Sequence, residues 1–96
     1  MNIRISDLAA DWYEQEMNLK HGDFVQFYVR YGGDSSIQKG FSLGLSIDQP
    51  TDLAFKTVKN GITYYIEEKD VWYFENHNFH IDLNTKINEP EFVFTK

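Results

Sequence analysis

Alternation of apolar and polar residues with a period of two constrains the fold of this chain more than any other feature. The segment 41–47 alternates without a fault, because Phe, Leu, Leu and Ile are separated by Ser, Gly and Ser. Successive side chains of a strand point to opposite faces, so the pattern predicts a strand with one buried face. Residues 24–31 predict a similar strand, with one apolar and one mixed face. Both segments are therefore expected to cover a hydrophobic core.

Further strands are predicted where similar segments are bounded by turn residues. Residues 53–58 and 62–66 flank Asn60-Gly61, a dipeptide typical of two-residue hairpins. Residues 79–83 and 91–95 complete the set, and Pro90 before the last of them removes a hydrogen-bond donor where its loss costs least. The spacing does not suit βαβ units, which favours antiparallel pairing.

One helix is predicted near the amino terminus, from Asp7 to Lys20. Ser6 is a suitable N-cap, and Gly22 suits the left-handed position that follows a helix. The predicted apolar stripe consists of Leu8, Trp12 and Leu19, with Ala9 and Met17 beside it.

These elements predict a mainly β (α+β) fold with antiparallel strands, about six to seven in number, an N-terminal helix and a short helical turn near 69–74. The 96 residues are expected to form one domain, 1–96, because a second would lack a core of its own. Aromatic residues make up 17 % of the chain and fall mostly at inward-facing strand positions, so they are assigned to the core.

Composition excludes several classes of function. The chain has no cysteine, so it cannot itself supply disulfides, thiol nucleophiles or thiolate-bound zinc and iron–sulfur sites. Fifteen acidic and nine basic residues give a formal net charge of −6, which argues against a nucleic-acid or anionic-membrane surface. No apolar run approaches the roughly 20 residues of a membrane span, and no signal-peptide pattern opens the chain. A cytoplasmic protein is therefore expected.

The segment 31–40 is the candidate functional loop. It separates two strands that a short turn could join, and long loops on a rigid sheet often carry function. Its adjacent glycines allow positive φ, and its polar side chains supply oxygens and amides. The candidate residues are Gly32, Gly33, Asp34, Ser35, Ser36 and Gln38. The alternative interpretation is a solvated connector, and the residues alone leave both open.

Catalytic and metal sites are not predicted. His77, His80 and Asp82 lie within six residues, and with Asp34 they are the candidate metal ligands, but the histidine side chains, three positions apart on a strand, point to opposite faces. The acidic residues after position 66 are interpreted as a solvated face. No serine lies in a Gly-x-Ser-x-Gly context, so a non-enzymatic protein is expected.

The order of these segments resembles that of a known family. The segments are the helix, then 23–33 (DFVQFYVRYGG), 40–45 (GFSLGL), 61–74 (GITYYIEEKDVWYF) and 88–92 (NEPEF). In this order the chain resembles the HesB-like, A-type iron–sulfur carrier family, within a bacterial branch that lacks the ligand cysteines. The resemblance implies a β-rich pseudobarrel or sandwich capped by a helix.

Carriers of that family bind iron or a cluster through three cysteines. The first cysteine position falls on Asp34, and no Cys-Gly-Cys occurs in the tail that ends at Lys96. The resemblance therefore implies an interaction or accessory module with a protein partner in iron–sulfur assembly. No cofactor and no cluster is expected from this chain alone. The alternatives are an iron binder with oxygen ligands, or a small-ligand binder that uses 31–40.

Overall fold

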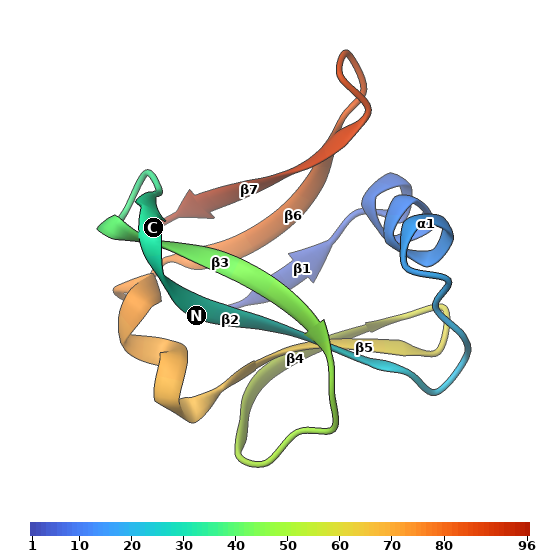
Figure 1. Cartoon of the computed structure of the whole chain (residues 1–96), viewed down its shortest axis with the longest axis horizontal. Coiled ribbons are helices and arrows are strands. Elements are labelled where there is room, and N and C mark those ends of the chain that lie inside the picture. Colours follow the sequence, from blue (N-terminus) through green and yellow to red (C-terminus); the bar gives the residue numbers. More distant parts are fainter.

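The computed structural model describes all 96 residues and contains two β-sheets, one α-helix and one 3₁₀ helix (Figure 1). In chain order the elements are β1 (Ile3–Ile5), α1 (Asp7–Glu16), β2 (Phe24–Asp34), β3 (Lys39–Ile47), β4 (Leu53–Lys59), β5 (Ile62–Glu67), η1 (Glu68–Phe74), β6 (Asn78–Asn84) and β7 (Glu89–Thr95). The mainly β (α+β) class is confirmed, and so are the amino-terminal helix and the helical segment near 69–74. Neither helix is long and apolar enough to cross a membrane.

The strands form a three-stranded sheet, in the order β1-β6-β7, and a four-stranded sheet, in the order β3-β2-β5-β4. β1 pairs with β6, and β2 with β5, in parallel, whereas the other neighbours are antiparallel. Parallel neighbours require a long crossover connection. The connection between β2 and β5 contains β3 and β4, which are the two edge strands of the sheet. The segment that joins β3 to β4 therefore crosses from one edge of the sheet to the other. The expected antiparallel pseudobarrel is therefore corrected to two mixed, open sheets.

The core lies where the two sheets, α1 and η1 meet. Aromatic rings fill it: Phe27 of β2 contacts Phe79 of β6 and Phe92 of β7 edge to face, with ring centroids 5.4 and 5.7 Å apart. Phe79 also stacks on Phe94 at 5.4 Å. Leu43 of edge strand β3 packs against this core while remaining half-buried. Six of the sixteen aromatic residues belong to the core cluster and five more are partly buried against it, so the assignment of most aromatic residues to the core is confirmed.

Helix α1 begins as predicted but ends earlier. The Ser6 hydroxyl accepts a hydrogen bond from the N–H of Ala9 at 3.1 Å, which confirms the N-cap. The helix ends at Glu16, and Asn18 takes the left-handed conformation (φ 52°) expected after the last helical turn. Gly22 therefore belongs to the following turn and does not end the helix.

The predicted stripe of α1 is wrong at Leu8, whereas Trp12, Met17 and Leu19 pack against the core as predicted. Ala9, Ala10 and Tyr13 are buried, whereas Leu8 is 55 % exposed. Two adjacent alanines let the helix backbone approach β6 closely, and Tyr13 then reaches the core, with its ring 6.3 Å from that of Phe27. Close approach of the backbone thus decides which face is buried, although the leucine is the more apolar residue.

The loop at 31–40 is shorter than expected. β2 continues to Asp34 and β3 begins at Lys39, so residues 35–38 alone form the turn. A register shift between Tyr31 and Asp34 accommodates the extra residues as a bulge. Gly33 lies within it at φ 67°, which favours glycine, and a Cβ there would come within 3.3 Å of Ser42 Cβ. The ten-residue loop is corrected to a bulged hairpin with a four-residue turn.

Candidate functional site

Three neighbouring aromatic side chains beside the β2–β3 hairpin are called here the aromatic surface: the exposed Tyr31 and Trp72, and the half-buried Phe41 between them, which also packs against the core. Tyr31 is 91 % exposed and Trp72 is 51 % exposed. Their rings meet edge to face through Phe41, with centroid distances of 5.7 Å to Tyr31 and 5.2 Å to Trp72. Isolated exposed apolar residues are ordinary, but a contiguous group marks an interaction site.

Three elements, β2, β3 and η1, carry the residues of the aromatic surface. Tyr31 and Phe41 are directly opposite each other on β2 and β3. η1 is anchored by the buried rings of Tyr73 and Phe74, and it presents Trp72 outward. The Gln38 side chain donates a hydrogen bond to the Tyr73 carbonyl at 3.3 Å, which ties the hairpin turn to η1. The hairpin turn and η1 are therefore joined beside the aromatic surface.

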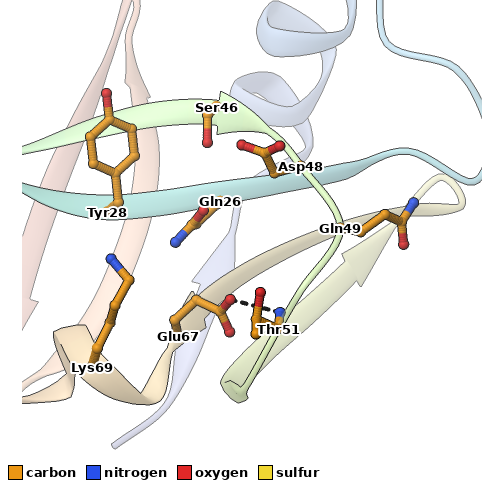
Figure 2. A pocket seen from close by; sticks show the side chains of 8 residues that line it. All are labelled: Gln26, Tyr28, Ser46, Asp48, Gln49, Thr51, Glu67 and Lys69. Carbon is orange, nitrogen blue, oxygen red and sulfur yellow. Dashed lines mark hydrogen bonds between the residues drawn. The ribbon is translucent and has the colours of Figure 1, made fainter.

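A second feature, called here the polar pocket, is an open depression of about 480 Å³ on the outer face of the four-stranded sheet (Figure 2). It is lined by Gln26 and Tyr28 of β2, Ser46 of β3, Glu67 of β5, Lys69 of η1, and Asp48, Gln49 and Thr51 of the segment that joins β3 to β4. Only one of these residues, Tyr28, is hydrophobic.

Glu67 fixes the β3–β4 connection over the sheet. Glu67 is only 5 % exposed. Its two carboxylate oxygens accept hydrogen bonds from the N–H groups of Thr51 and Asp52, both at 2.8 Å. The Tyr65 hydroxyl donates to the Asp48 carbonyl at 2.7 Å. Burial, followed by the charges of Glu67 and Asp48, raises the pKa of Tyr65, so the hydroxyl keeps its proton. One wall of the pocket is thus rigidly attached to the sheet.

Tyr28 forms another wall because its cross-strand neighbour is glycine. Gly44 lies opposite Tyr28 and is buried. A Cβ at Gly44 would lie 2.6 Å from the Tyr28 ring, so the ring rests against bare backbone. A glycine inside an alternating strand commonly marks such a close approach. Gly44 within the alternating segment 41–47 is the one sequence feature from which this pocket could have been predicted.

The residues of the predicted functional loop hold the hairpin turn together. Asp34 accepts a hydrogen bond from the Gly40 N–H at 2.6 Å, and the Ser35 hydroxyl accepts one from the Gln38 N–H at 3.1 Å. Gly32 lies at the end of β2, and Ser36 is exposed in the turn. These residues adjoin the aromatic surface and do not line the polar pocket.

The residues considered as metal ligands do not converge. No group of three or more histidine, aspartate or glutamate side chains is placed to hold a metal ion. His77 Nδ1 lies 2.8 Å from the Phe74 carbonyl oxygen, whereas His80 lies in the middle of β6, opposite Val93 of β7. Asp34 is engaged in the hairpin turn.

Sequence reasoning did not identify Tyr31, Phe41 or Trp72 as site residues. The alternation that places Tyr31 on the face of Val25 and Phe27 carries no information on where the core ends. Tyr31 lies beyond that limit and is exposed. The aromatic run in η1 likewise does not reveal which of its rings faces outward.

Comparison with known proteins identifies full-length relatives. The chain is 45 % identical over 94 residues to a Bacillus subtilis (strain 168) protein named "Pyruvate dehydrogenase inhibitor", covering 98 % of this chain and 99 % of the relative. It is 42 % identical over 96 residues to an uncharacterised protein of Staphylococcus saprophyticus, covering 97 % and 98 %. An uncharacterised protein of Staphylococcus aureus (strain MRSA252) is 32 % identical over 99 residues.

The resemblance to the A-type iron–sulfur carriers is wrong. No family model matches the chain, and the named full-length relative is an inhibitor of pyruvate dehydrogenase. The resemblance rested on the order of a helix and of segments that contain alternating strands and glycines. Alternating strands and glycines also occur in any bulged hairpin with paired strands, so they carry no information on what the protein binds. An iron–sulfur accessory role and a partner in iron–sulfur assembly therefore have no support.

The relative's name describes a regulatory protein, in agreement with the expected non-enzymatic role. An inhibitor of an enzyme acts on another protein, which also agrees with the expected protein partner. Identity extends over nearly the full length of both chains. This chain therefore belongs to the family of the Bacillus subtilis pyruvate dehydrogenase inhibitor.

Proposed function

We propose that this protein is a regulator that binds pyruvate dehydrogenase and lowers its activity. The observation that carries the proposal is the 45 % identity over nearly the whole chain to the Bacillus subtilis inhibitor of that enzyme. No insertion or missing domain separates the two chains, since the match covers 99 % of the relative. The whole relative, and not one module of it, is therefore the basis for the proposal.

The aromatic surface supports binding to a protein partner. Tyrosine and tryptophan are enriched among the residues that dominate protein interfaces, because they bury a large apolar area at little entropic cost. Tyr31 and Trp72 have this chemistry, and both rings contact Phe41 edge to face. We assign the contact with the enzyme to this surface.

The test is the activity of purified pyruvate dehydrogenase encoded in the same genome, measured against increasing concentrations of this protein. We expect activity to fall to a plateau, and a stable complex to elute in size-exclusion chromatography. Unchanged activity and no complex at a large molar excess would overturn the proposal.

Variants separate the aromatic surface from the rest of the molecule. We expect Tyr31→Ser and Trp72→Ala each to weaken binding by about 2 kcal/mol, roughly 30-fold in Kd, as removal of a central interface residue does. Leu8→Ser is the control, because Leu8 is similarly exposed but lies on α1, at the opposite end of the molecule from the hairpin turn (Figure 1). If all three variants changed the Kd equally, the aromatic surface would not be the site of contact with the enzyme.

A further inference from the structure

We propose that two copies of this chain form a twofold-symmetric dimer in which their β3 strands pair edge to edge and antiparallel. β3 is an outermost strand of the four-stranded sheet, and β2 is its only neighbour there (Figure 1). The dimer joins the four-stranded sheets of the two copies into one continuous sheet. The inference is independent of the proposed function, because the dimer forms from this chain alone.

β3 lacks the features that commonly protect an exposed strand edge. Edge strands are usually very short or carry a charge or a proline, because their unpaired N–H and C=O groups would otherwise pair with another chain. β4 contains Lys56 and Lys59, β7 contains Pro90 between two glutamates, and β1 has only three residues. Residues 40–47 of β3 contain neither a charged residue nor a proline. β3 is therefore the edge that remains open to another strand.

The hydrogen bonds between β2 and β3 determine which backbone groups of β3 are free. The Asp48 N–H donates to the Phe24 carbonyl at 3.2 Å, in register with the other pairs of these two strands. In an antiparallel pair only every second residue bonds the neighbouring strand, so the even-numbered residues of β3 bond to β2. The odd-numbered residues, among them Leu43 and Leu45, direct their N–H and C=O groups toward the open edge.

The sequence of β3 is complementary to itself in an antiparallel pair. Residues 41–47 read Phe-Ser-Leu-Gly-Leu-Ser-Ile, a pattern that is nearly the same in both directions from Gly44. A twofold axis at Gly44 places Leu43 opposite the partner's Leu45, and Phe41 opposite the partner's Ile47. All four are odd-numbered, so the interface gains about eight backbone hydrogen bonds. The two copies of Gly44 meet at the axis as a non-hydrogen-bonded pair, in which the backbones come closest.

Pairing also covers apolar side chains that a single copy leaves partly exposed. Ile47 is 50 % exposed, and Leu43 and Leu45 are half-buried. In the dimer each of them lies opposite another apolar side chain, which is a favourable cross-strand pair. On the other face of the sheet, Ser42 lies opposite the partner's Ser46, so only short polar side chains meet there. Both faces are thus compatible with this register.

The charges beside β3 are complementary in the same register. The ion pairs of the monomer are Lys59 with Asp7 and Lys69 with Asp70, so the exposed Arg30 and Asp48 side chains are both unpaired. Arg30 lies opposite Ser42, on the outer face of the sheet. The partner's Asp48 lies on that face too, about 12 Å from Arg30 between Cα atoms by the usual strand spacings. Two extended side chains can span this distance, so the dimer supplies a counter-charge for each.

The first test is sedimentation velocity of the full chain over a range of concentrations. We expect the mass to rise from that of a monomer to that of a dimer. Ser42→Lys combined with Ser46→Lys places like charges opposite each other and should raise the dissociation constant at least tenfold. Thr85→Lys combined with Thr95→Lys is the control, because it adds the same charge outside β3. A chain that stays monomeric, or equal weakening by both double variants, would overturn the proposal.

The second test is cysteine cross-linking, which reports on the register. The chain has no cysteine of its own. In the dimer a cysteine at position 42 faces one at position 46 of the second copy, with Cα atoms about 4.5 Å apart, within reach of a disulfide. We expect mild oxidation to link a mixture of Ser42→Cys and Ser46→Cys chains, and neither variant alone. No link in the mixture, or equal links in either variant alone, would contradict the register. Because the enzyme is absent, neither outcome depends on whether pyruvate dehydrogenase is inhibited.

Discussion

At the scale of single residues, Glu67 and Gly44 show how one side chain, or the lack of one, shapes the outer face of the four-stranded sheet. Glu67 accepts two backbone hydrogen bonds from the β3–β4 connection, and Gly44 leaves room for the Tyr28 ring. Both residues act through close, specific contacts, so substitutions at either position make direct tests of the structure.

Replacing Glu67 should loosen the β3–β4 connection. Glu67→Ala leaves the N–H groups of Thr51 and Asp52 without their acceptor, and we expect a loss of about 1–3 kcal/mol in the free energy of unfolding. Urea denaturation measures it, and hydrogen exchange should become faster at those two amides. Glu68→Ala, at the exposed next position, is the control and should be nearly neutral. If the Glu67→Ala variant were as stable as the unmodified protein and the amides of Thr51 and Asp52 stayed protected, the Glu67 carboxylate would not be what holds the β3–β4 connection.

Substitution of Gly44 tests the packing of Tyr28. The added methyl group of Gly44→Ala would lie 2.6 Å from the Tyr28 ring, so the ring must move, and we expect a loss of about 1–3 kcal/mol. In a Tyr28→Ala background the same substitution should cost much less, because the clash is gone. Thermal or urea denaturation of the double-mutant cycle measures the coupling. Additive effects would mean that the two residues do not interact.

At the scale of elements, α1 is joined to β4 by an ion pair at its first turn. Lys59 Nζ lies 2.8 Å from Oδ1 of Asp7. The hydrogen bond from Lys59, and then its charge, lower the pKa of Asp7. The same carboxylate lies at the amino end of α1, where a negative charge is favourable.

The pH dependence of stability follows from the direction of that shift. A carboxyl group with a lower pKa in the folded state contributes stability above its unfolded pKa, about 3.9, and loses that contribution as the pH falls through the folded value. Lys59→Met should therefore lower stability at pH 6 and have a smaller effect at pH 2. Urea denaturation at both pH values checks this, with Lys56→Met on the same strand as the control. An effect of Lys59→Met that is the same at both pH values would exclude the ion pair as its cause.

At the scale of the whole molecule, the side chains that can act as metal ligands decide which cofactors the chain can hold. It has no thiolate, and its histidines are not grouped with other ligands. Iron–sulfur clusters depend on thiolates, which histidine replaces only in part. We therefore expect anaerobic reconstitution with iron and sulfide, followed by desalting, to leave no visible absorption and no acid-labile sulfide. A stoichiometric cluster would contradict this expectation, and His77 and His80 would then be the first residues to replace.

Local features of the sequence determined where most elements lie. The alternation in 41–47 predicted β3, Ser6 predicted the start of α1, and Asn60-Gly61 predicted the β4–β5 hairpin, in which both residues have positive φ. Each depends on interactions within a few residues, so each can be recognised without knowledge of the rest of the chain. β1 was missed because a strand of three residues is too short to show a period.

Tertiary structure alone decided how the elements combine. The parallel pairing of β2 with β5 joins segments about forty residues apart, and no local pattern encodes that choice. The polar pocket follows from it, because the connection that crosses to β4 carries Asp48 and Thr51 over the sheet. The exposure of Tyr31 and Trp72 likewise depends on where the core ends. A side chain's type and period are local properties, whereas its burial is set by every element packed around it.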